Sequence, residues 1–191
     1  MTPDDHAAEA PEDLLGLTLA AAVRDRQTVT PRGGLVRDLP DGVTIHRSQT
    51  IVDDRGVLFE LFDPRWDWHP DPIITSYVMT VRPGRAKGWA VHKAHEDRYA
   101  ILFGEIELVL YDVRPTSSTR GRVFRIVLSE YDRCQINIPA FVWHGNRNLG
   151  SRDAVLVNFP TVPFDHANPD KYRLPIDSPL IPYSFQGAPG W

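Results

Sequence analysis

Two polar stretches of the sequence carry side chains that can move protons. The first, residues 88–99, contains His92, and the second, residues 138–148, contains His144. Histidine is the natural base at neutral pH because its ordinary pKa is about 6.5. Proton transfer next to a ketone needs a base, a donor to the developing enolate and an acid that returns the proton. We therefore predict that His92 and His144 are catalytic, together with the phenol of Tyr99.

Charged and aromatic side chains close to the first stretch could bind an anionic ligand that contains a ring. The cations of Lys87 and Arg98 could neutralise phosphate groups, and Trp89 could stack on a base or on one face of a sugar. Structural roles are expected for His95 in a surface loop, for Trp66 and Trp68 in a loop packed on the body, and for Cys134 in the core.

The composition indicates a globular protein without a strong overall electrostatic field. Apolar residues make up 42% of the chain and charged residues 24%, which excludes wholesale disorder. The formal net charge is −4, and residues 1–23 contain five acidic and no basic side chains. The rest of the chain is therefore close to neutral, and we expect no nucleic-acid partner.

Cysteine content and hydropathy restrict the compartment and the type of metal site. The single cysteine, Cys134, excludes an intramolecular disulfide and a cysteine-based zinc site. No apolar run reaches the length of a membrane span, and the N-terminus lacks the pattern of a signal peptide. We expect a cytoplasmic protein with no membrane partner.

One helix is predicted, over residues 11–26, preceded by an acidic tail. Pro11 and acidic residues stand at its start, and Arg24 and Arg26 at its end, as the helix dipole favours. Its leucines could form an apolar stripe for packing or for a dimer contact. We expect residues 1–30 to hold the tail and this helix, and residues 31–191 to form a single domain.

From residue 42 onward the sequence is typical of an all-β protein. β-branched and aromatic residues gather in short segments separated by turn residues, which favours an antiparallel sandwich or barrel. The segments are residues 43–51, 56–62, 75–83, 98–113, 122–129, 133–139 and 153–159. Seven of the 17 prolines fall in residues 160–191, so this part cannot be a central strand. We predict that it wraps over the barrel and closes with Tyr183 and Phe185.

The two polar stretches resemble the paired signature motifs of the cupin superfamily. In the first stretch, the interval from Asp97 to Gly104 and the position of His92 fit the motif. The residues that match the second motif are Pro139, His144 and Asn148, whereas Phe141 departs from its usual glycine. The resemblance implies a cupin-type (jelly-roll) antiparallel β-barrel.

A narrower resemblance is to the dTDP-4-dehydrorhamnose 3,5-epimerase family of cupins. The stretches that carry it are residues 54–60, 112–121 and 138–145, and order and spacing agree over roughly residues 45–183. The resemblance implies a nucleotide-sugar ligand, a homodimer and no cofactor. It also implies that Arg55 and Glu60 bind the nucleotide, often across the dimer.

The chain departs from this family at positions that the family uses for catalysis. Ala90 occupies the position of the catalytic histidine, and Asn158 falls near the expected tyrosine, where it could contact the substrate. The aspartate that pairs with the histidine comes from a C-terminal extension that this chain is not expected to contain. The residues from Gly88 to Lys93 also resemble the Gly-x-His-Ala-His-Lys motif of sugar-nucleotide 3,4-ketoisomerases, except at the first histidine.

These observations lead to one preferred function and two alternatives. We predict a nucleotide-sugar (dTDP-4-keto-deoxysugar) epimerase or ketoisomerase that transfers protons without a metal. A divergent member could instead bind a sugar nucleotide without converting it. A metal-dependent enzyme could use His92, Asp97 and His144, which are the donor types of a two-histidine, one-carboxylate site.

Overall fold

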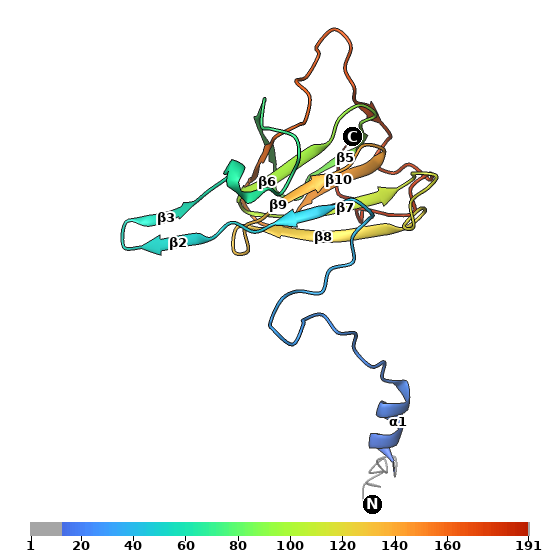
Figure 1. Ribbon diagram of the computed structural model, residues 1–191. Helices are drawn as coiled ribbons and strands as arrows, with labels where there is room; N and C mark the ends of the chain where they lie inside the picture. Colours follow the sequence, from blue (N-terminus) through green and yellow to red (C-terminus); the bar gives the residue numbers. More distant parts are fainter. Residues whose placement is uncertain (1–12, 191) are drawn as a thin grey trace, which may run out of the picture. The chain divides into compact units, whose positions relative to one another are not determined.

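The computed structural model describes residues 13–190, which fall into two units (Figure 1). One unit is Met1–Arg37 and the other is Asp38–Trp191. Within residues 13–190, no helix combines the length and the apolar character that crossing a bilayer requires.

The first unit contains a short helix, α1 (Leu14–Ala21). The carboxylate of Asp13 caps it by accepting a hydrogen bond from the Gly16 amide at 2.7 Å. The prediction of a helix over residues 11–26 was therefore too long: residues 11 and 12 lie outside the described part, and Ala22 is already extended. None of its residues is buried, so no tertiary packing extends a helix this short beyond its intrinsic limit.

The second unit is a sandwich of two five-stranded antiparallel sheets, as the sequence predicted. The first sheet has the order β1 (Thr44–His46), β9 (Gln135–Ile138), β6 (Asp97–Phe103), β11 (Ala154–Asn158) and β4 (Tyr77–Val81). The second has the order β12 (Tyr172–Arg173), β5 (Ala86–Val91), β10 (Val142–Asn148), β7 (Glu105–Asp112) and β8 (Val123–Ser129). A separate hairpin joins β2 (Thr50–Asp53) to β3 (Gly56–Phe59), and a 3-10 turn, η1, covers Pro64–Trp66.

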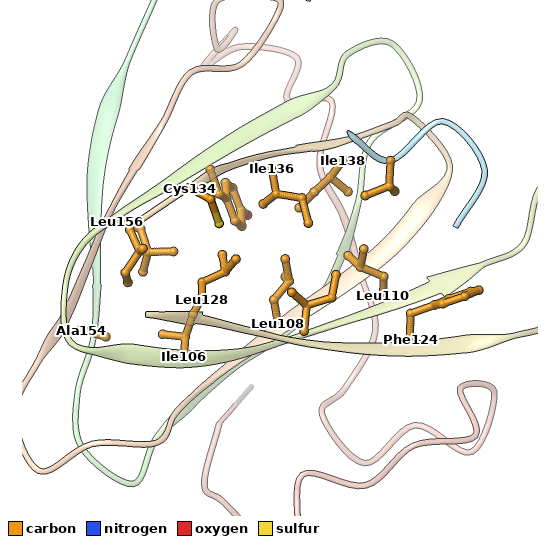
Figure 2. Close-up of a cluster of buried hydrophobic side chains, with 14 of the residues drawn as sticks. Ile106, Leu108, Leu110, Phe124, Leu128, Cys134, Ile136, Ile138, Ala154 and Leu156 are labelled. Atoms are coloured by element: carbon orange, nitrogen blue, oxygen red, sulfur yellow. The ribbon is translucent and has the colours of Figure 1, made fainter. Parts of the chain in front are cut away.

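The core lies between the inner faces of the two sheets (Figure 2). Strand β8 shows how the sequence produces it, because Phe124 and Leu128 are buried whereas Arg125 and Val127 between them are exposed. This alternation follows from the period of two residues in a strand. The largest aliphatic core residues are Ile101, Ile106, Leu108, Leu110, Leu128, Ile136, Ile138 and Leu156. Each such side chain contributes about 1.5–3 kcal/mol when it is removed from water.

The turn between β6 and β7 requires a glycine. Gly104 has a φ of +79°, and a Cβ there would lie 3.0 Å from the Cα of Ala154. The long apolar run predicted over residues 98–113 therefore folds back on itself at this residue.

The proline-rich C-terminal segment packs on the outer face of the second sheet, as predicted. Ile181 and Phe185 are buried there against Trp89 and Val109. A Cβ on Gly145 of β10 would lie 2.9 Å from the Phe185 ring, so the close approach depends on glycine. Strand β12 of this segment pairs only with the edge of β5, which agrees with the expectation that no central strand occurs here.

Candidate active site

Asp97 is a buried carboxylate at the start of β6, where it faces three histidines. Its Oδ2 lies 3.2 Å from His92 Nε2 and 3.4 Å from His144 Nε2. Its Oδ1 accepts a hydrogen bond of 2.7 Å from the Asn158 amide and lies 3.7 Å from His95 Nε2. The side chain of Asp97 is only 2% exposed. This carboxylate therefore organises the polar groups of both predicted stretches.

Strand pairing explains why these side chains meet. On β6, Asp97 and Tyr99 point into the sandwich while Arg98 between them points to the other face, because side chains alternate along a strand. On β10, His144 stands opposite Ala90 of β5. The small side chain at position 90 leaves open space beside the His144 ring, and both residues line the same cavity.

The electrostatics assign different charge states to the two histidines that face Asp97. Burial opposes the charged form of His92, but the adjacent Asp97 carboxylate raises its pKa above the ordinary value. For His144, burial lowers the pKa to about 4, against the attraction of Asp97. The pKa of Asp97 is lowered, since His92 and His144 outweigh the effect of its burial. At neutral pH His144 is therefore uncharged, whereas Asp97 favours the charged form of His92.

Asp170 joins the C-terminal segment to the histidine-rich loop after β5. Its carboxylate accepts hydrogen bonds from the amides of Lys93 (3.0 Å) and Ala94 (2.7 Å), and it lies 2.9 Å from His95 Nδ1. Its carbonyl oxygen lies 2.5 Å from His92 Nδ1. The prediction that His95 belongs to a surface loop was wrong, because Asp170 and Asp97 hold its side chain at 11% exposure.

A cavity of about 130 Å³ opens beside His144 between the two sheets. Its lining includes three basic side chains and two tyrosines but no acidic one. The lining residues are Tyr77, Met79, Lys87, Gly88, Ala90, Tyr99, His144, Asn146, Lys171 and Arg173. Burial raises the pKa of Tyr77 to about 12 and raises that of Tyr99 well above its ordinary range. Both phenols are therefore proton donors at neutral pH, in a cavity suited to an anion.

The structure brings several of the predicted site residues to this cavity. Tyr99, His144 and Lys87 line it. His92 and Asn158 lie behind this lining, where both contact Asp97. Asp97 therefore links His92 to His144, which lines the cavity.

Two predicted binding residues have other roles in the structure. Trp89 is fully buried under the C-terminal segment, where its ring lies 5.2 Å from that of Phe185. Arg98 points away from the cavity and donates hydrogen bonds to the carbonyls of Asp71, Pro72 and Phe159. In this chain neither side chain is available to a ligand in the cavity.

Arg55 and Glu60 lie on the hairpin β2–β3, outside the set of residues that line the cavity. Arg55 is exposed and forms an ion pair with Asp53 of the same hairpin at 2.5 Å. Within the single chain, their predicted contact with a nucleotide is therefore not formed at this cavity.

Two groups of side chains could hold a metal ion among residues 13–190. They are His92, Asp97 and His144, and His92, His95 and Asp170, with ligand atoms within 4.8 Å of one another in each group. Two imidazoles and a carboxylate fit the donor preference of Fe(II) and related ions. His92 Nε2 already lies 3.2 Å from Asp97, however, and the lining of the adjacent cavity includes three cationic side chains.

Sequence reasoning missed the contribution of the segment before and within β12. Asp170 fixes the histidine loop, and Lys171 and Arg173 provide two of the three cations of the cavity. A C-terminal aspartate thus reaches the site, although the sequence was not expected to supply one. The available signal was the charged run at residues 170–173 within a proline-rich segment.

Comparisons with known proteins identify similar proteins, although no family model matches the chain. A probable low-salt glycan biosynthesis epimerase, Agl13, of Haloferax volcanii is 34% identical over 137 residues, which cover 71% of this chain and 87% of that protein. A dTDP sugar isomerase structure from Desulfovibrio desulfuricans G20 has a TM-score of 0.72 and 27% identity, and covers 80% of this chain and 97% of that one.

The same fold occurs in the 3'-monoepimerase ChmJ of Streptomyces bikiniensis, whose structure contains dTDP-quinovose. It has a TM-score of 0.69 and 18% identity, and the match covers 80% of this chain and 79% of that one.

Proposed function

Because the chain belongs to the dTDP-4-dehydrorhamnose 3,5-epimerase-like family of cupins, we propose that it converts a nucleotide sugar by proton transfer. The substrate is a dTDP-4-keto-deoxysugar, and the reaction is an epimerisation or a ketoisomerisation next to the ketone. The observation that supports this proposal is the cationic cavity in which uncharged His144 and protonated Tyr99 stand side by side, with ring centroids 5.9 Å apart.

The chemistry assigns one step to each group. The His144 imidazole accepts the proton from the carbon next to the ketone, and the electron pair of the broken C–H bond moves to the ketone oxygen as an enolate. Lys87 and Lys171 stabilise this oxyanion by charge. Tyr99 returns a proton to carbon, and the carbonyl re-forms. Asp97 stabilises the imidazolium of His144 after the first step.

A homodimer would complete the site through the hairpin β2–β3, which extends from the sandwich (Figure 1). Ile51, Val52, Val57 and Leu58 of this hairpin are all more than half exposed. A two-stranded hairpin without a packing partner is marginally stable in water. A second subunit that covers these side chains would also receive Arg55 as a phosphate-binding group.

A metal-dependent isomerase is the second candidate, favoured by the proximity of His92, Asp97 and His144. A divalent ion held by these residues would polarise the ketone as a Lewis acid. Dialysis against EDTA separates the two candidates. The metal-free proposal predicts unchanged turnover, whereas loss of turnover that is restored by a divalent ion would support the second.

Active-site variants test the proposed roles. Turnover of dTDP-4-keto-6-deoxyglucose is followed by NMR for His144→Gln and Tyr99→Phe, with Tyr131→Phe as a matched control at a site that is 84% exposed. We expect kcat to fall by about 10²–10⁴-fold in the first two variants, the usual contribution of general acid–base catalysis. The Kd for dTDP should stay within a few fold. Retained turnover would refute the assignment, and binding without turnover in the wild type would identify a catalytically silent member.

A further inference from the structure

A second cavity, of about 260 Å³, lies on the opposite side of the first sheet from the candidate active site. Strand β6 separates the two, because Tyr99 lines one cavity and the neighbouring Arg98 lines the other. The loop formed by residues 62–73, called here the aromatic loop, supplies most of the lining of this second cavity.

Hydrogen bonds from strand β6 and within the loop hold the aromatic loop in place. The buried guanidinium of Arg98 donates hydrogen bonds to the carbonyls of Asp71 at 2.6 Å and Pro72 at 3.0 Å. His69 Nε2 lies 3.2 Å from a carboxylate oxygen of Glu96. The Asp63 carboxylate caps η1 by accepting from the Arg65 amide at 2.8 Å. The cavity is therefore preformed, which lowers the entropic cost of binding a ligand.

The walls combine aromatic rings with carboxylates. The lining residues that define its chemistry are Phe62, Asp63, Trp66, Asp67, Trp68 and Asp71. His46 stacks on Trp66 with a centroid distance of 4.1 Å and so fixes the orientation of that ring. The indole Nε1 of Trp68 is a buried donor without a hydrogen-bond partner among the described residues.

We propose that this cavity binds an uncharged pyranose, either free or as a residue of a glycan. Aromatic rings bind the C–H face of a sugar, and carboxylates accept hydrogen bonds from its hydroxyl groups. A sugar supplies hydroxyl donors to these carboxylates, which a quaternary ammonium ion does not. The volume is close to the lower limit of small-molecule sites, about 300 Å³, so it suits one ring and not a whole nucleotide sugar.

The charge of this cavity also separates it from the candidate active site. Its lining contains three carboxylates and the cation of Arg98, whereas three cations and no carboxylate line the cavity beside His144. Because Asp63 is paired with Arg65, the charges around the former nearly cancel, whereas the latter attracts a nucleoside diphosphate. The two cavities therefore select different ligands.

The indole resonances of the full-length protein test the proposal directly. The indole N–H signals are recorded during titration with sugars up to about 50 mM, which covers millimolar affinities. The sugars are the methyl glycosides of glucose, galactose, mannose, N-acetylglucosamine and rhamnose, and an oligosaccharide of each. Trp68→Phe assigns the Trp68 signal by removing it. We expect at least one sugar to shift the Trp68 N–H signal, because Trp68 lines the cavity.

Variants establish where the sugar binds. Trp66→Ala and Asp67→Asn should weaken binding at least tenfold, whereas Asp153→Asn, at an exposed position of the same sandwich, should not. Asp67 has a φ of 49°, which asparagine tolerates, so this variant keeps the loop conformation. The proposal is overturned if no sugar shifts the signal, if tetramethylammonium binds more tightly than every sugar, or if both variants bind as the wild type does. Tighter binding of an oligosaccharide than of the corresponding methyl glycoside would identify the ligand as a residue of a glycan.

Discussion

The uncharged state of His144 predicts a specific dependence of stability on pH. In the folded protein, burial lowers the pKa of His144 to about 4, compared with 6.5 for a free side chain. Between these values the unfolded chain binds a proton that the folded chain does not. The contribution of His144 to stability must therefore fall as the pH falls from 6.5 to 4. The interval corresponds to about 3 kcal/mol, since one pKa unit is about 1.4 kcal/mol.

The variant His144→Gln isolates this effect because glutamine keeps a polar group of similar size and does not titrate. We expect the free energy of unfolding of the wild type to drop by about 3 kcal/mol more than that of the variant between pH 7 and pH 4. The assay is urea denaturation at half-unit pH steps, monitored by tryptophan fluorescence. His166→Gln, at an exposed position, is the matched control and should follow the wild type.

His92 lies close to His144, and its effect on stability depends on pH in the opposite direction. His92 has a raised pKa in the folded state, so its stabilising effect is present at low pH and is lost as the pH rises. This contribution has the opposite sign to that of His144, so it cannot produce the loss of stability at low pH that is assigned to His144. Parallel pH profiles for the wild type and His144→Gln would refute the claim that His144 is buried and uncharged.

Two further predictions concern the C-terminal segment. Phe185→Ala should lower the free energy of unfolding by about 3–5 kcal/mol, measured by urea denaturation, because it leaves a cavity against Trp89 and Gly145; a loss below 1 kcal/mol would show that the segment does not pack tightly. Asp170→Ala should lower the free energy of unfolding by about 1–3 kcal/mol, because the amides of Lys93 and Ala94 lose their acceptor. The same variant should lower kcat at least tenfold through His92 and His95, whereas the exposed control Asp177→Ala should leave both quantities unchanged.

The fold could be predicted because its signal is local and repeated. The alternating apolar residues of β8 predict a strand, and Gly104 predicts the turn between β6 and β7, in each case from the local sequence alone. Propensity did not predict strands β5 and β10. The sequence of β10, VWHGNRN, is rich in polar residues, and that of β5, AKGWAV, contains a single β-branched residue and no alternating pattern. They are strands because β10 pairs with β5 and β7 on its two sides, a tertiary effect that overrides local preference.

The candidate site was predictable only in the part that short motifs encode. His92, Asp97 and His144 fall in two such motifs. The structure brings both histidines within 3.4 Å of one carboxylate oxygen of Asp97. The sequence does not show which face of its sheet the side chain of Trp89 or Arg98 occupies. Strand register decides this, and pairing with strands distant in the sequence sets the register. Lys171 and Arg173 reach the cavity only because the C-terminal segment returns to the edge of β5.

Deuterium incorporation from solvent tests the central claim most directly. The protein is incubated in ²H₂O with dTDP-4-keto-6-deoxyglucose, and the sugar is analysed by NMR and mass spectrometry after EDTA treatment. Proton transfer at the cavity of His144 predicts replacement of at least one hydrogen on a carbon next to the ketone, and loss of that exchange in His144→Gln. A sugar that binds and returns without deuterium, or exchange that persists in His144→Gln, would contradict the account.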